Sequence, residues 1–204
     1  MIECILFDLG GVVLESPLEA IAAHEEDNHL PSGTINRAVA AAGDNCAWAR
    51  HERGEIGFVQ FCDAFEAEMA AAGFVVDVAS LLAQIEAFAT PRPAVLAEIQ
   101  RLRAAGLKIG AVTNNWESMR DAGLAEHFDV IVESCVEGVR KPEPEIVERS
   151  LTRLDAKAAS TLMLDDIGPN LKTARLLGME TFKVTDEAAL LERLAAIRGR
   201  SESA

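Results

Sequence analysis

The chain of 204 residues has few positive charges. Its 19 lysines and arginines stand against 33 aspartates and glutamates, which gives a formal net charge of −14. Such a charge repels nucleic-acid phosphates and anionic lipid headgroups at long range. We therefore expect neither nucleic acid nor a membrane as a partner. A small anionic substrate is still compatible with this charge, provided that a metal ion and a few basic groups reverse the local field.

Other sequence signals are also missing. No apolar run approaches the ~20 residues of a membrane-spanning helix, and the N-terminus has no basic segment followed by an apolar stretch and a cleavage site. The four cysteines form no CxxC pair, so we expect free thiols in a reducing compartment. These are Cys4, Cys46, Cys62 and Cys135. Together these absences predict a cytoplasmic protein.

Hydrophobic residues make up 50% of the chain, enough for a sizeable core. Several short, nearly continuous apolar runs are typical of strands buried on both faces of a parallel sheet. Amphipathic helical segments separate the later runs, and this alternation predicts an α/β fold. The predicted strands are residues 3–7, 107–112, 129–133, 161–164 and 180–184, and the predicted helices are residues 93–105, 145–154, 171–177 and 187–197.

The first predicted strand ends at residue 7 and the second begins at residue 107, a gap far too long for one crossover connection. Between them, apolar side chains recur mainly at helical spacing. We predict a helical cap at residues 15–89, inserted into a core of residues 1–14 and 90–204. An apolar cap face fits a monomer or a homodimer equally well. The side chains expected in the cap core are Phe58, Phe61, Cys62, Phe65, Met69, Leu81, Leu82, Ile85 and Phe88.

Asp8 is the most informative residue. It follows the apolar residues 5–7 and precedes Gly10 and Gly11. A carboxylate suits a site at a strand end better than a core, and glycines let a ligand approach the backbone. Because a carboxylate can attack phosphorus and form an aspartyl-phosphate, we interpret Asp8 as a candidate nucleophile.

Polar residues follow two later strands in the same way. Asp165 and Asp166 offer the oxygen ligands that Mg²⁺ prefers, although an aspartate there also suits a helix N-cap. Thr113 offers a hydroxyl, and the amides of Asn114 and Asn115 follow it. That arrangement can hold phosphate oxygens, and it also occurs in ordinary turns.

Lys141 is the fourth element. Pro142 after it favours an extended conformation at the lysine. A lysine there can pair as a point charge with a phosphate and a nucleophile, and it can equally be a surface residue of a loop. All four elements together indicate phosphate-transfer chemistry, with Asp8, Thr113 and Lys141 as the catalytic candidates.

With these motifs the chain resembles the haloacid dehalogenase (HAD) superfamily. The motifs are FDLGGV at 7–12, VTN at 112–114, KP at 141–142 and LDD at 164–166. Residues 30–33, 53–56, 128–141 and 164–172 further resemble the N-terminal phosphatase domain of soluble epoxide hydrolase and the HAD-like domain of certain large acyl-CoA dehydrogenases.

The resemblance implies a Rossmann-like parallel sheet in the order 5-4-1-2-3 with a small inserted helical cap. It also implies a Mg²⁺-dependent phosphomonoester hydrolase for a small phosphorylated molecule. The metal would be held by Asp8, the Gly10 carbonyl and Asp166, with Asp165 outside the direct ligands or bridging through water. Asn170 stands where many relatives have a further Asp. The expected phosphate-binding residues are Gly10, Gly11, Thr113, Asn114, Asn115 and Lys141.

Gly10 departs from the pattern of most HAD phosphatases, which have an Asp two residues after the nucleophile. That Asp protonates the leaving oxygen and then activates water. Glycine can do neither, so we consider replacements from the cap: His24, His51 and Glu55. Each of these three also fits a solvated helix or loop.

The cap is expected to select the substrate. Trp48, Arg50 and Arg53 are candidates for contact with an anionic or flat group, and they equally fit a packed tryptophan and solvated arginines.

Two other functions are compatible with parts of the pattern. Dehalogenase or phosphonatase chemistry fits less well, because the paired acids favour a metal and residues 15–89 contain no lysine. A phosphate- or metabolite-binding module with weak catalysis is the alternative that Gly10 supports.

Overall fold

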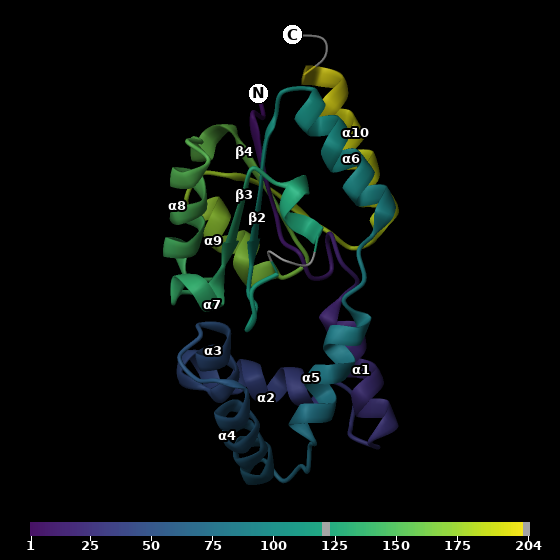
Figure 1. Cartoon of the computed structure of the whole chain (residues 1–204), viewed down its shortest axis with the longest axis vertical. Coiled ribbons are helices and arrows are strands. Elements are labelled where there is room, and N and C mark those ends of the chain that lie inside the picture. The colour runs from purple at the N-terminus through teal and green to yellow at the C-terminus, as the bar shows by residue number, and fades with distance from the viewer. Residues whose placement is uncertain (120–122, 202–204) are drawn as a thin grey trace.

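The computed structural model describes residues 1–119 and 123–201. Five parallel strands form one sheet in the order β3-β2-β1-β4-β5 (Figure 1). This is the predicted order read from the other edge. The strands are β1 Cys4–Phe7, β2 Lys108–Thr113, β3 Val130–Glu133, β4 Thr161–Asp165 and β5 Glu180–Lys183.

The central strand β1 shows why the sheet is layered. Ile5 and Phe7 belong to the hydrophobic cluster on one face, and Cys4 and Leu6 to the cluster on the other. Alternate side chains of a strand point to opposite faces, so a strand buried on both faces is apolar throughout. Helices α6 and α10 cover one face, and α8 and α9 cover the other (Figure 1).

Four core helices lie close to the predicted ranges: α6 Pro93–Ala104, α8 Pro144–Arg153, α9 Gly168–Leu176 and α10 Glu187–Ser201. The short helix α7, Ser134–Glu137, was not predicted. Helix α9 begins three residues before the predicted start, since Pro169 fits the first helical turn, where a missing N–H costs nothing. Short 3₁₀ turns occupy Ala125–His127 and Ala158–Ser160.

A group of helices between β1 and α6 forms the cap, at the lower end of the molecule in Figure 1. They are α1 Pro17–Asp27, α2 Thr34–Ala42, α3 Ala47–Glu52, α4 Phe58–Ala71 and α5 Val78–Phe88, with a 3₁₀ turn at Gly43–Asn45. These helices bury a hydrophobic cluster of their own. The two connecting segments run together, with Leu14 bridged to Pro91 and Glu15 paired with Arg92 at 2.9 Å.

Most of the predicted cap stripes are buried, including Phe61, Phe65 and Met69. Two of the predicted core side chains are exposed instead: Phe58 is 51% exposed and Phe88 is 37% exposed. They are the first residue of α4 and the last residue of α5. At a helix end, fewer neighbouring elements surround the side chain, so helical spacing alone does not ensure burial.

All four cysteines are free thiols. Burial raises the pKa of the Cys4 thiol to about 11, which keeps it protonated and unreactive at neutral pH. Within the described residues, none of the helices has the length and apolar content needed to cross a membrane.

Candidate active site

The carboxyl ends of the central strands meet at the edge of the sheet that faces the cap. Asp8 follows β1, Thr113 ends β2 and Asp165 ends β4. The Asp8 backbone N–H donates to Leu164 O at 2.8 Å, which continues the pairing of β1 with β4. Parallel neighbouring strands therefore deliver the two carboxylates to one place, as in other open α/β sheets.

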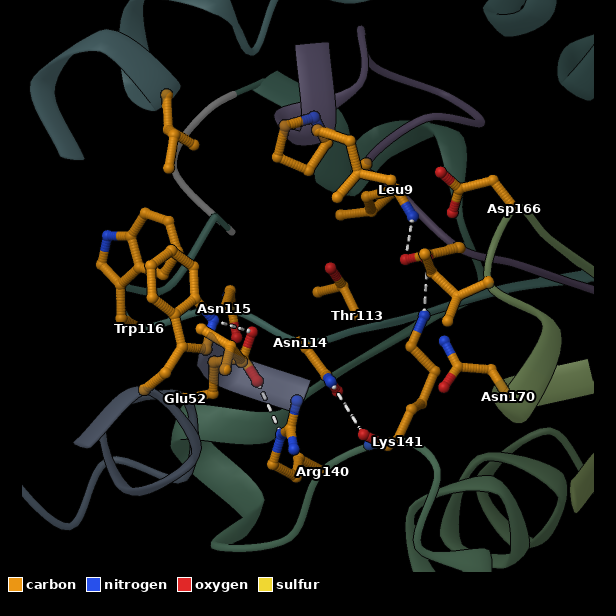
Figure 2. Close-up of a pocket in the computed structure, with 18 of the residues that line it drawn as sticks. Leu9, Glu52, Thr113, Asn114, Asn115, Trp116, Arg140, Lys141, Asp166 and Asn170 are labelled. Atoms are coloured by element: carbon orange, nitrogen blue, oxygen red, sulfur yellow. Dashed lines mark hydrogen bonds and ion pairs between the residues drawn. The ribbon is translucent and has the colours of Figure 1, made fainter. Parts of the chain in front are cut away.

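Lys141 joins these carboxylates. Its Nζ lies 2.7 Å from Asp8 Oδ2 and 2.9 Å from Asp165 Oδ2, and the side chain is 2% exposed. Burial alone would lower the pKa of Lys141, but the adjacent Asp165 and Asp8 carboxylates raise it. The lysine is therefore charged and lies against Asp8. Figure 2 shows Lys141 among Thr113, Asn114 and Asn170, which also line the cavity.

Asp165 is engaged by the protein on several sides. Its Oδ1 accepts from Ile167 N–H at 2.7 Å, and Asn170 Nδ2 lies 3.1 and 3.0 Å from its two oxygens. The residue is fully buried. With Lys141 also bonded to it, Asp165 orients the lysine and has little capacity left for another ligand.

Asp166 points toward the loop after β1. Gly11 has φ +73°, and a Cβ built on it would lie 2.4 Å from Asp166 Oδ2. A side chain at position 11 would therefore both strain the backbone and collide with this carboxylate. The glycine is what lets the Asp8 loop and Asp166 approach each other.

The acids fit a divalent cation. Carboxylate oxygens of Asp8, Asp165 and Asp166 all lie within 4.8 Å of one another. Burial raises the pKa of Asp8 well above its usual range, with the Lys141 charge opposing the shift and Asp165 adding to it. Burial and the neighbouring Asp165 also raise the pKa of Asp166. Clustered buried acids with this shift are a place where a hard cation would favour ionisation.

The three residues after β2 differ in their use. Thr113 is buried and lines the cavity, and no other described residue forms a hydrogen bond with its hydroxyl. The Asn114 side chain clasps the backbone of Lys141, with Nδ2 to Lys141 O at 2.9 Å and Lys141 N–H to Oδ1 at 2.8 Å. Its amide side chain therefore holds the segment 138–143 between α7 and α8, which carries Lys141 and which we call the lysine loop.

Asn115 forms hydrogen bonds with residues near the ends of β2 and β3. Its Nδ2 donates to Glu117 O at 2.8 Å and to Glu133 Oε1 at 3.0 Å, and its N–H donates to Ser134 Oγ. Its Oδ1 is buried without a hydrogen-bond partner. Asn115 thus ties the end of β2 to the end of β3.

A cavity of about 850 Å³ opens between these residues and the cap. Asp8, Thr113, Lys141 and Asp166 lie at its core end. Most cap side chains in its wall are apolar: Leu18, Ile21, Ile35, Val39, Trp48 and Ile85.

The cap residues considered as replacements for the acid missing at position 10 do not line the cavity. His24 and His51 are buried, which corrects the idea of solvated positions, and neither lines the cavity. His24 Nδ1 bonds with Gln84 Oε1, and His51 Nδ1 with Ile56 O. Glu55 is exposed and pairs with Arg53 and Arg50.

Of the three predicted substrate-selecting residues, Trp48 lines the cavity and the two arginines do not. Sequence reasoning missed several polar or aromatic lining residues, among them Glu15, Glu52, Trp116 and Arg140. Trp116 directly follows Asn115, and Arg140 directly precedes Lys141. Their position next to these motifs was the available signal.

Comparison with known families now adds to this geometry. The family model of haloacid dehalogenase-like hydrolases matches residues 2–178. The chain belongs to this family. It is therefore a HAD-like hydrolase, and proteins named as phosphatases are among its relatives.

Several relatives match nearly the whole chain. Mouse acyl-CoA dehydrogenase family member 10 is 36% identical over 204 residues, covering 97% of this chain and 19% of its own length. Pig bifunctional epoxide hydrolase 2 is 31% identical, covering 95% of this chain and 38% of its own length. This HAD-like hydrolase therefore corresponds to a minor part of each. Sesquiterpene phosphatase astK of Aspergillus oryzae is 26% identical, and 95% of each chain is matched.

A solved HAD family enzyme from Bacteroides thetaiotaomicron, crystallised with magnesium and inorganic phosphate, has the same fold. Its TM-score is 0.64 at 20% identity, over 92% of this chain and 97% of that one.

The departure at Gly10 has a structural counterpart in this HAD-like hydrolase. A Cβ at position 10 would lie 3.0 Å from Cδ and 3.2 Å from Cγ of Pro17, the first residue of α1. The proline ring therefore packs against the place where an acidic side chain would begin.

Proposed function

We propose that this HAD-like hydrolase is a Mg²⁺-dependent phosphomonoesterase in which Asp8 is the nucleophile. The observation that carries the proposal is the position of Lys141 Nζ, 2.7 Å from Asp8 Oδ2, inside a cluster of three carboxylates. A carboxylate beside a fixed cation, at the bottom of a cavity, is suited to attack an anionic phosphorus centre once it is ionised.

Asp8, Asp166 and the Gly10 carbonyl are the groups that would hold Mg²⁺. When bound, Mg²⁺ supplies positive charge that offsets the charge of the phosphate oxygens. Fixed positive charge of this kind also favours the ionised form of Asp8, whose pKa burial raises.

Asp8 Oδ attacks phosphorus and the ester oxygen leaves, which forms an aspartyl-phosphate. Lys141 and the Thr113 hydroxyl contribute donors to the phosphoryl oxygens as charge develops. Water then attacks the same phosphorus, inorganic phosphate leaves and the Asp8 carboxylate is restored. Asp165 acts through Lys141, since it holds the lysine at 2.9 Å.

Gly10 leaves the departing oxygen without a protein acid at the usual place. A positioned acid or base is typically worth about 10²–10⁴ in rate. We therefore propose that this enzyme prefers esters whose leaving group needs little protonation, or substrates that carry their own acid.

The cavity supports a phosphomonoester with an apolar body. Apolar cap side chains line the wall opposite Asp8, and a volume of about 850 Å³ accommodates a molecule of substantial size. The similarity to a protein named as a sesquiterpene phosphatase agrees with such a substrate.

The direct test is phosphate release from p-nitrophenyl phosphate, with Mg²⁺ and with EDTA, by wild type and Asp8→Asn. We expect many turnovers by wild type and none in EDTA or in the variant, with the variant's circular dichroism unchanged. Turnover by Asp8→Asn at the wild-type rate would exclude Asp8 as the nucleophile.

A phosphate-binding module with little catalysis is the second candidate, and the packing of Pro17 against Gly10 favours it. Phosphate release together with thermal unfolding distinguishes the two functions. A binder would show Mg²⁺-dependent thermal stabilisation by inorganic phosphate without turnover.

A further inference from the structure

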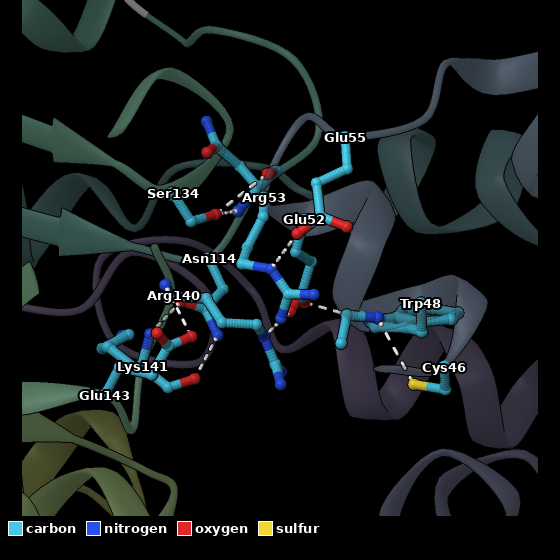
Figure 3. A network of polar contacts seen from close by, with 12 residues as sticks. Cys46, Trp48, Glu52, Arg53, Glu55, Asn114, Ser134, Arg140, Lys141 and Glu143 are labelled. Atoms are coloured by element: carbon cyan, nitrogen blue, oxygen red, sulfur yellow. Dashed lines mark hydrogen bonds and ion pairs between the residues drawn. The ribbon is translucent and has the colours of Figure 1, made fainter. Parts of the chain in front are cut away.

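The cap contacts the lysine loop through a largely buried ion pair. Arg140 Nε donates to Glu52 Oε2 at 2.6 Å, across 88 positions of sequence (Figure 3). The two side chains are 17% and 10% exposed. Glu52 Oε1 also accepts from Trp48 Nε1 at 3.0 Å, so the carboxylate is held from both sides. A buried pair with a fixed geometry loses much if one partner is removed.

Arg140 immediately precedes Lys141, so the Glu52–Arg140 ion pair acts on the lysine loop. From the core side, the Asn114 side chain makes two hydrogen bonds with the backbone of Lys141. Thr173 Oγ1 also donates to Pro142 O at 2.8 Å. Glu52 is a contact from the cap to the same loop, through Arg140.

A second contact brings the same end of α3 against the core. Gly54 has φ +70°, and a Cβ there would lie 2.5 Å from Cys135 O in α7. Only a glycine lets the cap backbone approach α7 so closely. This contact involves neither Glu52 nor Arg140, so it is independent support for docking of α3.

The loop after β2 makes a third contact with α3. The Trp116 ring stacks on His51, with centroids 5.9 Å apart and planes 11° apart, and meets Trp48 edge-on at 6.1 Å. Helix α3 therefore touches the loop next to Asn115 as well as the loop next to Lys141.

We propose that the Glu52–Arg140 ion pair is a positioning device, by which the docked cap fixes Lys141 for binding the transferred phosphate. The proposal rests on the proposed function of Lys141. Glu52 acts through Arg140 and is a positioning residue, since the lysine, and not Glu52, contacts Asp8.

The sign of one effect separates positioning from simple electrostatics. Glu52 is an anion in the wall of a cavity that takes an anion. If it acted only through its charge, Glu52→Gln would tighten phosphate binding by removing a repulsion. If it positions the lysine loop, the same change weakens phosphate binding.

The experiment compares wild type, Glu52→Gln, Arg140→Gln and the double variant. The control is Glu180→Gln, which removes the same charge from the Glu180–Arg193 pair at the sheet edge. Titration calorimetry measures the Kd of inorganic phosphate at saturating Mg²⁺ and the Kd of Mg²⁺ alone. We expect each single variant to weaken phosphate about tenfold, the double variant to be no worse than the weaker single, and Mg²⁺ affinity to be unchanged.

Tighter phosphate binding in Glu52→Gln, or equal losses of Mg²⁺ and phosphate affinity, would overturn the proposal. Amide hydrogen exchange of a peptide spanning residues 138–144 tests it without any ligand. Faster exchange in Glu52→Gln, and unchanged exchange in Glu180→Gln, is the expected result. Unchanged exchange in both would overturn the proposal even if the enzyme turns over. Faster exchange in an enzyme that binds no phosphate would instead contradict the proposed function alone.

Discussion

The core wall and the cap wall of the cavity are made of opposite kinds of side chain. Asp8, Lys141 and Asp166 at the core end are ionisable and lie on strand ends or in loops held by hydrogen bonds. The cap wall is mainly aliphatic and aromatic and belongs to helices with a hydrophobic cluster of their own. In the proposed function, chemistry and substrate choice therefore reside in separate parts of the molecule, joined where α3 meets the core.

The leaving group should produce the largest effect on the core side. Without an acid at position 10, alkyl phosphates should react about 10²–10⁴-fold more slowly than aryl phosphates of similar size. A series of phosphomonoesters with graded leaving-group pKa, assayed at saturating Mg²⁺, measures this. Equal rates across the series would mean that another group has taken the acid's role.

Removal of the lysine charge should come next. Lys141→Met should lower kcat by roughly 10²–10³, the range found when one preorganised donor to developing charge is lost. Lys157→Met, at an exposed position of the core, is the matched control and should keep the wild-type rate. Similar kcat values for both variants would remove Lys141 from the mechanism.

Mg²⁺ should stabilise the protein through the carboxylate cluster. At a hundredfold excess over Kd the stabilisation is about 2.7 kcal/mol, a rise in Tm of roughly 5–10 °C for a chain of this size. The pKa values of Asp8 and Asp166 are raised in the metal-free protein, so Mg²⁺ must displace protons from them. The rise in Tm should therefore grow as the pH is raised, because fewer protons have to be displaced. Scanning fluorimetry over a pH series measures it, and a larger rise at lower pH would contradict the assignment.

The smallest effect should come from the cap wall. Leu18 is 38% exposed and lines the cavity, so Leu18→Ala should raise KM for a long-chain alkyl phosphate several-fold and leave p-nitrophenyl phosphate turnover nearly unchanged. Leu176→Ala, at an exposed leucine outside the cavity, is the control. Equal losses for both substrates would show that the cap wall supports the chemistry rather than the choice of substrate.

Much of the fold could be predicted because its signals are local. The apolar runs at β1, β2, β3 and β4 are short and nearly continuous, as strands covered on both faces must be. The edge strand β5 has the sequence ETFK and is partly exposed along its length. The strand order came from the resemblance carried by four motifs, and the observed sheet confirms it. The prediction that Phe58 and Phe88 are buried was wrong, because exposure at a helix end depends on which elements lie nearby.

For the site, the residues next to a strand end were readable and their partners were not. Asp8, Thr113 and Asp166 were identified by their position after apolar runs and Lys141 by the proline that follows it, and all four line one cavity. The engagement of Asp165 by Lys141, Asn170 and Ile167 N–H required coordinates, because two aspartates in succession look alike in sequence.

By itself the sequence determined the layered α/β class, the parallel strands and the carboxylates at their ends, since each follows from the spacing of apolar and charged residues along a short stretch. The tertiary structure alone decided that Glu52 meets Arg140, that Pro17 packs against Gly10 and that His24 and His51 do not line the cavity. These contacts join segments far apart in the chain or depend on which way a helix faces. No local pattern specifies either of them, because both are set by how the cap packs on the core.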